Sequence, residues 1–582
     1  MRKLLVYLKD YKKESVLGPL FKLLEASFEL IVPLVMAAII DQGVAFKDKP
    51  YILKMCLVLV LLAAIGLVCS ITAQYFAAKA AVGFSTGLRH ALFEHMEKLS
   101  FSEMDTVGTS TLITRMTSDV NQVQNGVNLV LRLFLRSPFI VFGAMIMAFT
   151  IDVKAALVFV VAIPLLSVVV FGIMLISIPL YKKVQGALDK VLGITRENLT
   201  GARVIRAFNK EEDEIKEFNG HNEMLTAAQV YVGKISALMN PVTYVIVNGA
   251  IVALVWIGAL RVEGGAITQG EVVALVNYMS QILVELVKLA NLIININKSI
   301  ACGNRIQAVF ELESSIRDTG IPAGKTSGTE KEDGGFAVEF SHVGLTYAGA
   351  GDESLTDIHF AVKKGETVGI IGGTGSGKSS VVNLIPRFYE ATAGSVLVDG
   401  KDVREYSLKE LRDKVGVVLQ KAVLFKGTIR ENLAWGNGSA TEQEMSDALR
   451  IAQAKEFVET KEGGLDFEIE QGGKNLSGGQ RQRLTIARAL VKHPEILILD
   501  DSASALDFAT DAALRRAIRE MEGETTVFIV SQRAASIRHA DKIVVLDDGV
   551  IVGLGTHEEL LAGCEVYQEI YYSQFKKAAG GD

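Results

Sequence analysis

The stretch TVGIIGGTGSGKSS, residues 367–380, decides the fold of the second half of the chain. An apolar strand leads into the pattern G-x-x-x-x-G-K-[ST] at Gly372–Ser379, and the helical sequence VVNLIPRFY follows it. Glycines in such a loop let backbone N–H groups wrap around phosphates, and the N-terminus of the helix adds a favourable dipole. The sequence therefore predicts a nucleotide site in which Lys378 reaches the β- and γ-phosphates and the Ser379 hydroxyl ligates Mg²⁺.

A second apolar strand, ILILDD at residues 496–501, ends in two aspartates and runs into the turn SASALD. With the phosphate loop upstream, we expect Asp500 to hold Mg²⁺, directly or through water. Asp501 stands where a general base for an attacking water would stand. The alternative is that both aspartates are solubilising charges at the end of a strand. The phosphate loop argues against that alternative, more strongly for Asp500 than for Asp501.

A third feature begins at Asn475, where NLSGGQRQRLTIARAL opens a strongly helical run. A hydroxyl and small residues at the start of a helix make another surface suited to phosphate. One fold does not need two such surfaces for a single nucleotide. We therefore expect the segment Leu476–Gln480 to act on a nucleotide that another subunit holds.

The first half of the chain differs in composition from the second. The 582 residues are 49% hydrophobic, with a mean hydropathy of +0.31, and the first half carries runs such as MCLVLVLLAAIGLVCSI at 55–71. Because about 20 apolar residues span a bilayer, the sequence predicts a membrane domain followed by a cytosolic one. The net charge of −6 gives no support for nucleic acid as a partner. The four widely spaced cysteines suggest neither a metal site nor a disulfide framework.

Six membrane-spanning helices are predicted, at residues 16–44, 51–80, 128–151, 154–181, 239–262 and 268–297. The long stretches 81–127 and 182–238 are charged, helical in pattern and rich in Lys and Arg. These stretches lie on the same side as both termini, and the excess of basic residues identifies that side as cytoplasmic. We expect residues 1–15 to form a short amphipathic helix on the inner membrane surface.

A few charged side chains fall inside the predicted spans, among them Glu29, Glu285 and Lys288. Charge within the bilayer is costly and marks either a transport pathway or an ion pair. Glu285 and Lys288 stand at i, i+3 and can pair on one face of a helix. Contact with a transported substrate is the alternative.

The segment SSIRDTGIPAGKTSGTEKEDGG at 314–335 is polar and rich in Gly, and it predicts a linker. From FAVEFSHVGLTY onward, strands and helices alternate to about residue 575, a pattern that predicts an α/β domain with a mostly parallel sheet. The expected organisation is therefore multidomain: an all-α transmembrane domain at 1–313, a linker at 314–335 and an α/β P-loop nucleotide-binding domain at 336–582.

With these motifs in view, the chain resembles the ATP-binding cassette (ABC) exporters over essentially its whole length, as a half-transporter with six membrane helices and one nucleotide-binding domain. GARVIRAF at 201–208 and Phe101–Asp119 resemble the two long cytoplasmic loops of that family. The resemblance implies the following site residues: for nucleotide, Tyr347 (stacking on adenine), Gly372, Gly373, Thr374, Gly375, Ser376, Gly377, Lys378, Ser379, Ser380, Gln420 and Asp500; for Mg²⁺, Ser379, Gln420 and Asp500; in the signature, Leu476, Ser477, Gly478, Gly479 and Gln480; in the D-loop, Ser504 and Asp507.

Two positions depart from the family pattern. The catalytic glutamate is replaced by Asp501, and the switch histidine by Gln532 in IVSQRAAS. Asp is one methylene shorter than Glu, and misplacement by about 1 Å can cost about 10²-fold in rate. Gln can donate a hydrogen bond to a γ-phosphate but cannot become cationic. Together the two changes predict a site that binds ATP well and hydrolyses it poorly.

The resemblance therefore implies the degenerate-site subunit of a heterodimeric bacterial multidrug-type exporter. Such a chain is an ATPase and translocase of the cell membrane, with its nucleotide domain and both termini in the cytoplasm. Its cofactors would be ATP and Mg²⁺, and its partners a second half-transporter with Glu and His at the two altered positions, membrane lipid and a small hydrophobic substrate. A homodimer that hydrolyses ATP slowly with Asp501 and exports drug, lipid or peptide is one alternative. An ATP-gated channel or regulatory subunit is another.

Overall fold

The computed structural model describes residues 2–318, 335–521 and 525–575, so most of the predicted linker at 314–335 lies outside the described residues. The chain divides into two compact units. The first contains residues 1–97 and 110–311, and the second contains residues 98–109 and 312–582. The segment 98–109 thus belongs to the unit that carries the nucleotide motifs, although in sequence it lies between the two parts of the first unit.

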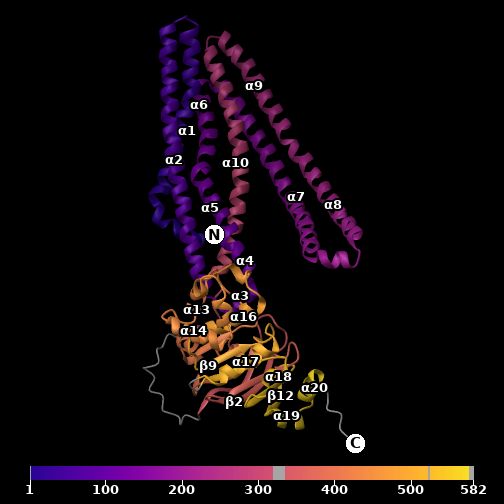
Figure 1. Cartoon of the computed structure of the whole chain (residues 1–582). Coiled ribbons are helices and arrows are strands. Elements are labelled where there is room, and N and C mark those ends of the chain that lie inside the picture. The colour runs from indigo at the N-terminus through magenta and orange to yellow at the C-terminus, as the bar shows by residue number, and fades with distance from the viewer. Residues whose placement is uncertain (1, 319–334, 522–524, 576–582) are drawn as a thin grey trace. The chain divides into compact units, whose positions relative to one another are not determined.

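The first unit is helical throughout its described secondary structure (Figure 1). A 3-10 helix at Arg2–Tyr11 runs directly into α1, so the expected separate surface helix at 1–15 is a short 3-10 extension of the first span. The α-helices are α1 (Lys12–Ala38), α2 (Lys49–Glu97), α4 (Thr109–Thr114), α5 (Val120–Leu129), α6 (Arg136–Ile151), α7 (Val153–Ala207), α8 (Glu211–Ala237), α9 (Met239–Glu263) and α10 (Gln269–Phe310). Short π-helical turns at Ile39–Val44, Arg115–Asp119 and Val130–Phe134 extend or join them.

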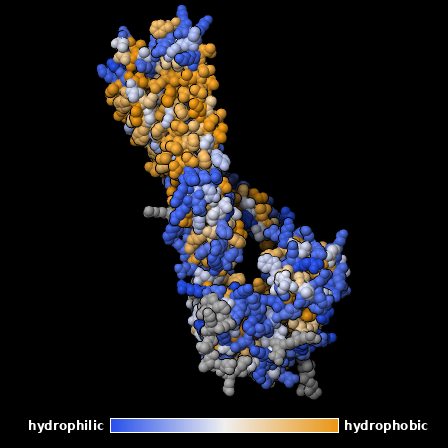
Figure 2. Space-filling model, turned by 90° about the vertical axis from the view of Figure 1, so that its left-hand side faces the viewer, coloured by the Kyte–Doolittle hydropathy of each residue, from blue (hydrophilic) through white to orange (hydrophobic). Residues whose placement is uncertain are grey.

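Within the described residues, six helical segments are long and apolar enough to cross a membrane, which confirms the predicted number. They are 42 to 55 residues long and extend well beyond the predicted spans. At about 1.5 Å per residue, helices of this length reach far past a hydrocarbon core of about 30 Å. Figure 2 shows the outward surface of these helices as a largely apolar band at the upper end of the view.

Small side chains allow the membrane helices to pack closely. The core of the first unit includes Ala26 of α1, Ala144 and Ala148 of α6, and Ala155 and Ala156 of α7, all at most 4% exposed. Helix association in a bilayer depends on such close backbone approach, because lipid tails are as apolar as the side chains. The aromatic Tyr278 of α10 is fully buried there, and its hydroxyl donates to the Leu30 carbonyl at 2.6 Å.

The second unit contains two main sheets. In the first, β1 (Phe336–Leu345), β2 (Leu355–Lys363), β4 (Ala393–Val398) and β5 (Lys401–Asp402) pair antiparallel in the order β2-β1-β4-β5. The second has the order β12-β11-β3-β10-β9-β6, and only β12 runs antiparallel. Its strands are β3 (Thr367–Gly372), β6 (Val415–Val418), β9 (Ile496–Asp500), β10 (Thr526–Val530), β11 (Lys542–Asp547) and β12 (Val550–Gly555). The mostly parallel sheet was predicted, whereas the separate antiparallel sheet was not.

Helices surround this six-stranded sheet, and its central strands are buried on both faces. The helices of the second unit are α3 (Phe101–Val107), α11 (Lys378–Leu384), α12 (Leu408–Lys414), α13 (Ile429–Ala434), α14 (Glu442–Ile451), α15 (Lys455–Glu459), α16 (Gly478–Leu490), α17 (Phe508–Arg519), α18 (Ala534–Ile537), α19 (His557–Gly563) and α20 (Glu565–Gln574). A two-stranded pair, β7 (Gly427–Thr428) and β8 (Glu468–Ile469), completes the unit.

Candidate nucleotide-binding site

The register of the parallel sheet brings the predicted motifs together. Strand β10 lies between β3 and β9, and Val530 of β10 pairs with Ile370 on one side and with Asp500 on the other. The carboxyl ends of parallel strands meet at one edge of a sheet, where ligands of open α/β folds bind. The phosphate loop after β3 and the aspartates after β9 therefore lie at the same edge, one strand apart.

The loop between β3 and α11 has a backbone that requires glycine. Gly375 and Gly377 have φ values of +86° and +91°, in the region that side chains disfavour. A Cβ on Gly372 would lie 2.1 Å from the Leu546 carbonyl oxygen and 2.5 Å from Ser376 Oγ. The loop can close tightly around a phosphate only because these positions carry no side chain.

Lys378 begins α11 and is only 8% exposed. Its ammonium group donates to the carbonyl oxygens of Gly372 (3.0 Å) and Gly373, and to Ser376 Oγ (3.3 Å). Burial lowers the pKa of Lys378, while Asp501 and Asp500 act in the opposite direction. The ammonium thus rests on the loop's own carbonyls, which are partners that a phosphate oxygen can replace.

Ser379 and Asp500 form the polar centre of the site. The Ser379 hydroxyl donates to Asp500 Oδ1 at 2.9 Å, and Asp500 is 6% exposed. Burial raises the pKa of Asp500, the hydrogen bond from Ser379 lowers it, and the charge of Asp501 raises it further. A hydroxyl, a carboxylate and the nearby amide of Gln420 supply the hard oxygen donors that Mg²⁺ prefers, so the residues present fit that ion.

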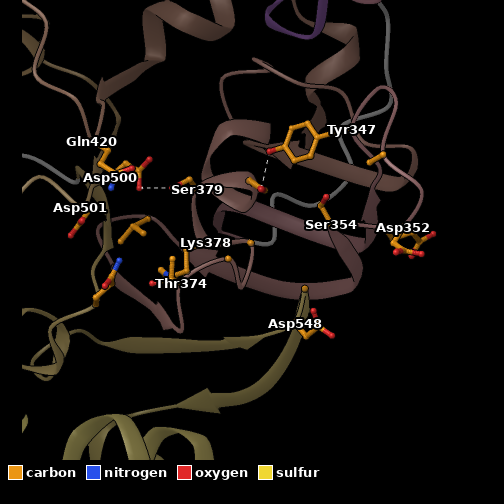
Figure 3. Close-up of a pocket in the computed structure, with 18 of the residues that line it drawn as sticks. Tyr347, Asp352, Ser354, Thr374, Lys378, Ser379, Gln420, Asp500, Asp501 and Asp548 are labelled. Atoms are coloured by element: carbon orange, nitrogen blue, oxygen red, sulfur yellow. Dashed lines mark hydrogen bonds between the residues drawn. The ribbon is translucent and has the colours of Figure 1, made fainter. Parts of the chain in front are cut away.

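Asp501 follows β9 with a φ of +43°, and its backbone N–H donates to the Val530 carbonyl at 3.0 Å. Burial raises the pKa of its carboxyl group, which Arg533, Lys378 and a hydrogen bond with Gln420 oppose. The positive φ and the hydrogen bond to Val530 together fix the direction in which the Asp501 carboxylate leaves the backbone. It lies on the same cavity wall as Asp500 (Figure 3).

Gln532 lies after β10, in a loop that the C-terminal helix holds. The Gln574 side chain of α20 donates to the Gln532 carbonyl at 2.7 Å and accepts from the Ala534 N–H at 2.9 Å. These two bonds fix the backbone of the loop, while the Gln532 side chain lines the cavity. Sequence reasoning did not identify Gln574, because nothing in the local pattern shows that a C-terminal helix returns to this loop.

These residues line one cavity of about 580 Å³ (Figure 3). Of the predicted nucleotide residues, Gly372, Gly373 and Ser376 lie behind the wall, where they contact Lys378. Sequence reasoning missed several lining residues that carry no motif and come from the turns before β2, after β10 and between β11 and β12. The complete lining is Tyr347, Ala350, Gly351, Asp352, Glu353, Ser354, Thr374, Gly375, Gly377, Lys378, Ser379, Ser380, Gln420, Asp500, Asp501, Val530, Ser531, Gln532, Asp548 and Gly549.

Tyr347 forms the opposite end of the cavity from Asp501 (Figure 3). Its hydroxyl donates to Ser380 Oγ at 2.8 Å, and its ring meets Tyr389 edge-on, with the centroids 5.0 Å apart. Tyr389 in turn donates to Asp105 of α3 at 2.5 Å, and burial together with Asp105 raises the pKa of Tyr389. The aromatic wall of the cavity is therefore tied directly to the cytoplasmic segment 98–109.

The signature segment lies outside this cavity. Ser477 caps α16 by accepting from the Gln480 N–H at 3.3 Å, while its own N–H donates to Gln480 Oε1 at 3.0 Å. Leu476 is buried, whereas Ser477 and Gly478 are exposed. No residue of 476–480 lines the cavity in the described structure, so these groups are not part of the nucleotide site of their own chain.

The predicted D-loop residues act as local caps. Ser504 Oγ donates to the Asp501 carbonyl at 2.8 Å, and Asp507 accepts from the N–H and hydroxyl of Thr510 at 2.9 and 2.8 Å to begin α17. Neither lines the cavity. Ser504 thus fixes the backbone of Asp501 from the other side, and both roles are structural within this chain.

Comparison with known families agrees with this geometry. Residues 15–286 match the family called ABC transporter transmembrane region, and residues 355–504 match the family called ABC transporter. The chain belongs to the ABC transporter family. As an ABC exporter it is a multi-pass membrane protein with a cytoplasmic ABC ATPase domain, and exporters of this family hydrolyse ATP and work as dimers.

Relatives are similar along almost the whole length of this ABC exporter. An uncharacterized ABC transporter ATP-binding protein of Mycobacterium tuberculosis is 37% identical, with 99% of this chain and 98% of the relative covered. A Bacillus subtilis protein named for multidrug export is 32% identical, over 99% of each chain. An ATP-dependent lipid A-core flippase of Desulfotalea psychrophila is 32% identical, over 84% of each chain.

Among solved structures, a bacterial Atm1-family ABC exporter with ATP bound has a TM-score of 0.78 and covers 98% of this chain and 99% of that chain. The sequence identity is 23%, so this similarity concerns the fold. It confirms the predicted architecture of a six-helix membrane domain followed by an α/β nucleotide-binding domain.

Proposed function

We propose that this ABC exporter chain is the degenerate-site subunit of a heterodimer that moves hydrophobic or amphipathic compounds out across the membrane. Its own cavity binds ATP with Mg²⁺ and hydrolyses it poorly. Its signature, Leu476–Gln480, completes a competent site on the partner subunit. The observation that carries this proposal is that both altered positions, Asp501 and Gln532, line the same cavity as Lys378 and Asp500.

The physical reason for poor hydrolysis is reach and charge. A general base must come within hydrogen-bond distance of the proton it removes, and Asp501 is one methylene shorter than Glu. Its backbone is fixed by the positive φ and by the bond to Val530, which limits how far the chain can move to compensate. Gln532 donates a neutral hydrogen bond where a cationic imidazole would give a charge-assisted one.

The need for a second subunit is supported by two surfaces. The signature of this chain lies outside its own cavity, with Ser477 and Gly478 exposed, so it is available to a nucleotide held by another subunit. Helix α8 buries only Leu225 and Val232 among its 27 residues, while Met224, Val230 and Tyr231 are exposed. These exposed apolar residues are available for contact with a second subunit.

In the proposed cycle, two ATP molecules hold the nucleotide-binding domains of the two subunits together. Closure is passed to the membrane helices through the cytoplasmic loops, which in this chain include α3 with its bond to Tyr389. Hydrolysis at the partner's site reopens the pair. ATP at the cavity of this chain persists over several cycles and favours partial contact of the domains. Ser379, Asp500 and Gln420 would hold Mg²⁺, which would supply positive charge to offset that of the phosphates.

The substrate class rests on the membrane unit and on the names of relatives. One relative is named for multidrug export and another as a lipid A-core flippase. Flexible methionine side chains suit varied apolar ligands, and Met145, Met147 and Met174 pack in or against the cores of this unit. A hydrophobic or amphipathic cargo fits both observations.

A slow homodimer is the second candidate, and one observation favours it. Asp501 keeps a carboxylate on the cavity wall, with a raised pKa that suits proton uptake better than that of an ordinary aspartate. In this case two copies of the chain would each complete the other's site with residues 476–480.

The test is steady-state Mg-ATP hydrolysis by the full chain purified alone into lipid, with ATP binding measured separately. Lys378→Ala provides the background, because it removes the ammonium group that contacts phosphate. We expect ATP binding without turnover above that background. Turnover that Lys378→Ala abolishes would instead support the homodimer and overturn the heterodimer proposal.

A further inference from the structure

A chain of four charged side chains crosses three helices of the membrane unit. Lys288 of α10 donates to Glu285 at 2.9 Å, Arg136 of α6 donates to Glu285 at 2.7 Å, and Arg136 also donates to Glu29 of α1 at 2.7 Å. The order of charges is therefore positive, negative, positive, negative. Sequence analysis identified the Glu285–Lys288 pair, which the structure confirms, but not Arg136 as its central member.

The two inner members of this chain are buried and the two outer members are not. The side chains of Arg136 and Glu285 are 9% and 4% exposed, whereas those of Glu29 and Lys288 are 41% and 49% exposed. Ser137 adds a hydrogen bond to Glu285 at 2.8 Å. The inner pair thus keeps its own charge balance if either outer side chain moves away.

The exposed ends cannot face lipid tails. Charge within the bilayer is directed toward a water-filled pathway or a protein interior, because its transfer into hydrocarbon is costly. The exposed face of α10 around Lys288 carries the polar residues Asn277, Ser280 and Asn291 at helical spacing, with the apolar Val284 between them. Within the described residues, the buried Nε of Arg136 and Oε1 of Gln281 have no hydrogen-bond partner. The region therefore has spare polar capacity.

The two buried members of the chain lie at similar distances from the ends of their helices. Arg136 lies 15 residues before the end of α6 at Ile151, and Glu285 lies 16 residues after the start of α10 at Gln269. At about 1.5 Å per residue, both lie roughly 22–24 Å from the outer ends of these helices.

We propose that Lys288 and Glu29 form a recognition site for a zwitterionic headgroup, with Lys288 binding an anionic group and Glu29 a cationic amine of the same transported amphiphile. This inference rests on the proposed export function and adds the substrate class to it. Each outer side chain exchanges an existing ion-pair partner for one on the cargo. The buried Arg136–Glu285 pair stays intact, so binding leaves no uncompensated charge in the membrane.

The test uses the full chain in detergent without nucleotide and three single-chain lipids of equal acyl length. Lysophosphatidylethanolamine is the zwitterion, lysophosphatidic acid the anion and monoacylglycerol the neutral probe. Affinity is measured by competition against an acyl-labelled lysophosphatidylethanolamine. We expect the zwitterion to bind about tenfold more tightly than the neutral lipid, which corresponds to about 1.4 kcal/mol. Lys288→Gln and Glu29→Gln should each reduce that preference several-fold, and Lys288→Arg should keep it.

Lys54→Gln, at an exposed lysine of α2 outside the charge chain, is the matched control and should change nothing. Thermal unfolding of every variant verifies that the fold is kept. Equal affinity for the zwitterionic and neutral probes would overturn the proposal. So would tight binding of the anion that depends on Lys288 alone, since the site would then recognise an anion only. Repeating the assay with Lys378→Ala separates headgroup binding from hydrolysis, so failure of the proposed ATP chemistry would leave this result unaffected.

Discussion

Two of the regions in which this protein buries charge, the membrane helices and the nucleotide cavity, stabilise it in opposite ways. In the membrane unit, Arg136 and Glu285 form an ion pair at 2.7 Å, and Ser137 supplies a further hydrogen bond. In the nucleotide cavity, Lys378 donates to backbone carbonyls, and among the described residues no ion pair joins it to Asp500 or Asp501. The first arrangement is complete without a ligand, whereas the second leaves opposite charges separated.

The difference shows how burial distinguishes structural from ligand-binding charge. A buried pair that satisfies itself fixes the helices that carry it, and removing one partner is costly. Buried charges that stay apart lower the stability of the ligand-free state, and a ligand with complementary charge recovers that loss. The shifted pKa values of Lys378, Asp500 and Asp501, all caused mainly by burial, express this cost in the cavity.

The largest effect should come from breaking the membrane pair. Glu285→Gln leaves the buried Arg136 with Glu29 as its remaining carboxylate, and loss of one partner from a buried pair costs about 3–5 kcal/mol. The variant should therefore unfold at a much lower temperature than the wild type. Unfolding is measured by the reactivity of the Cys69 thiol, which is buried in the folded protein. Lys298→Gln, at an exposed position of the same helix, is the control. An equal, small shift in both variants would mean that the pair is not structural.

The next largest effect should be on the rate of ATP hydrolysis in the nucleotide cavity. Asp501→Glu combined with Gln532→His restores the longer carboxylate and a side chain that can become cationic. We expect ATP turnover by the chain alone to rise by about 10²-fold over the wild type, because a displacement of about 1 Å in a catalytic group has an effect of that order. The comparison requires the same double substitution in a Lys378→Ala background. No increase would show that these two residues do not limit hydrolysis.

A smaller change in thermal stability is expected at Asp500, and it should be an increase, whereas Glu285→Gln should cause a decrease. Asp500→Asn removes a buried charge that has no cationic partner in the ligand-free cavity. The Tm of the nucleotide-free chain should therefore rise by about 2 °C or more. The same substitution should abolish the additional stabilisation that Mg-ATP gives to the wild type. A fall in the Tm of the nucleotide-free variant would show that Asp500 is needed for the fold itself.

The difference in stability between Asp500→Asn and the wild type should depend on pH, because the pKa of Asp500 is raised in the folded protein. A folded-state pKa above the unfolded value means that the folded protein holds the proton more tightly, so stability is lost as pH rises through that range. Below the ordinary Asp pKa of about 3.9, both forms are neutral and wild type and Asp500→Asn should unfold alike. The stabilisation of the variant should grow from there toward neutral pH. A constant difference would contradict the assignment to this carboxyl group.

The smallest effect should arise outside both charge clusters, where Tyr389 donates to Asp105 of α3. Tyr389→Phe removes one hydrogen bond of a half-buried side chain, which contributes about 1 kcal/mol. Hydrogen exchange of the α3 amides should become faster, while ATP binding is kept. Asp105→Asn completes a double-mutant cycle, and additive effects of the two changes would show that the two side chains are not coupled.

Local patterns were sufficient for much of this protein. The phosphate loop at Gly372–Ser379 needs glycine at fixed positions for steric reasons, so its sequence reveals its shape. A bilayer requires long uninterrupted apolar helices, which is why the number of spans could be predicted. Adjacent charges on one helix, such as Glu285 and Lys288, could also be paired from their spacing.

Other features depend on residues far apart in the chain. Arg136 joins Glu29 and Glu285 across three helices, and Gln574 returns from the C-terminal helix to hold the loop at Gln532. The turn residues around Asp352 and Asp548 line the cavity without any motif of their own. No local spacing encodes these contacts.

The sequence by itself determined the two-part architecture, the nucleotide motifs and the two altered positions in them, because each is a local requirement of backbone geometry, hydrophobic length or side-chain chemistry. Only the tertiary structure decided which charges on different helices and strands are paired and which stand apart. That distinction depends on strand order and helix packing, which bring Lys378 near two aspartates without pairing them and bring Arg136 between two glutamates. Burial makes an unpaired charge costly in free energy. A charge far from water must therefore be paired either within the protein or with a ligand.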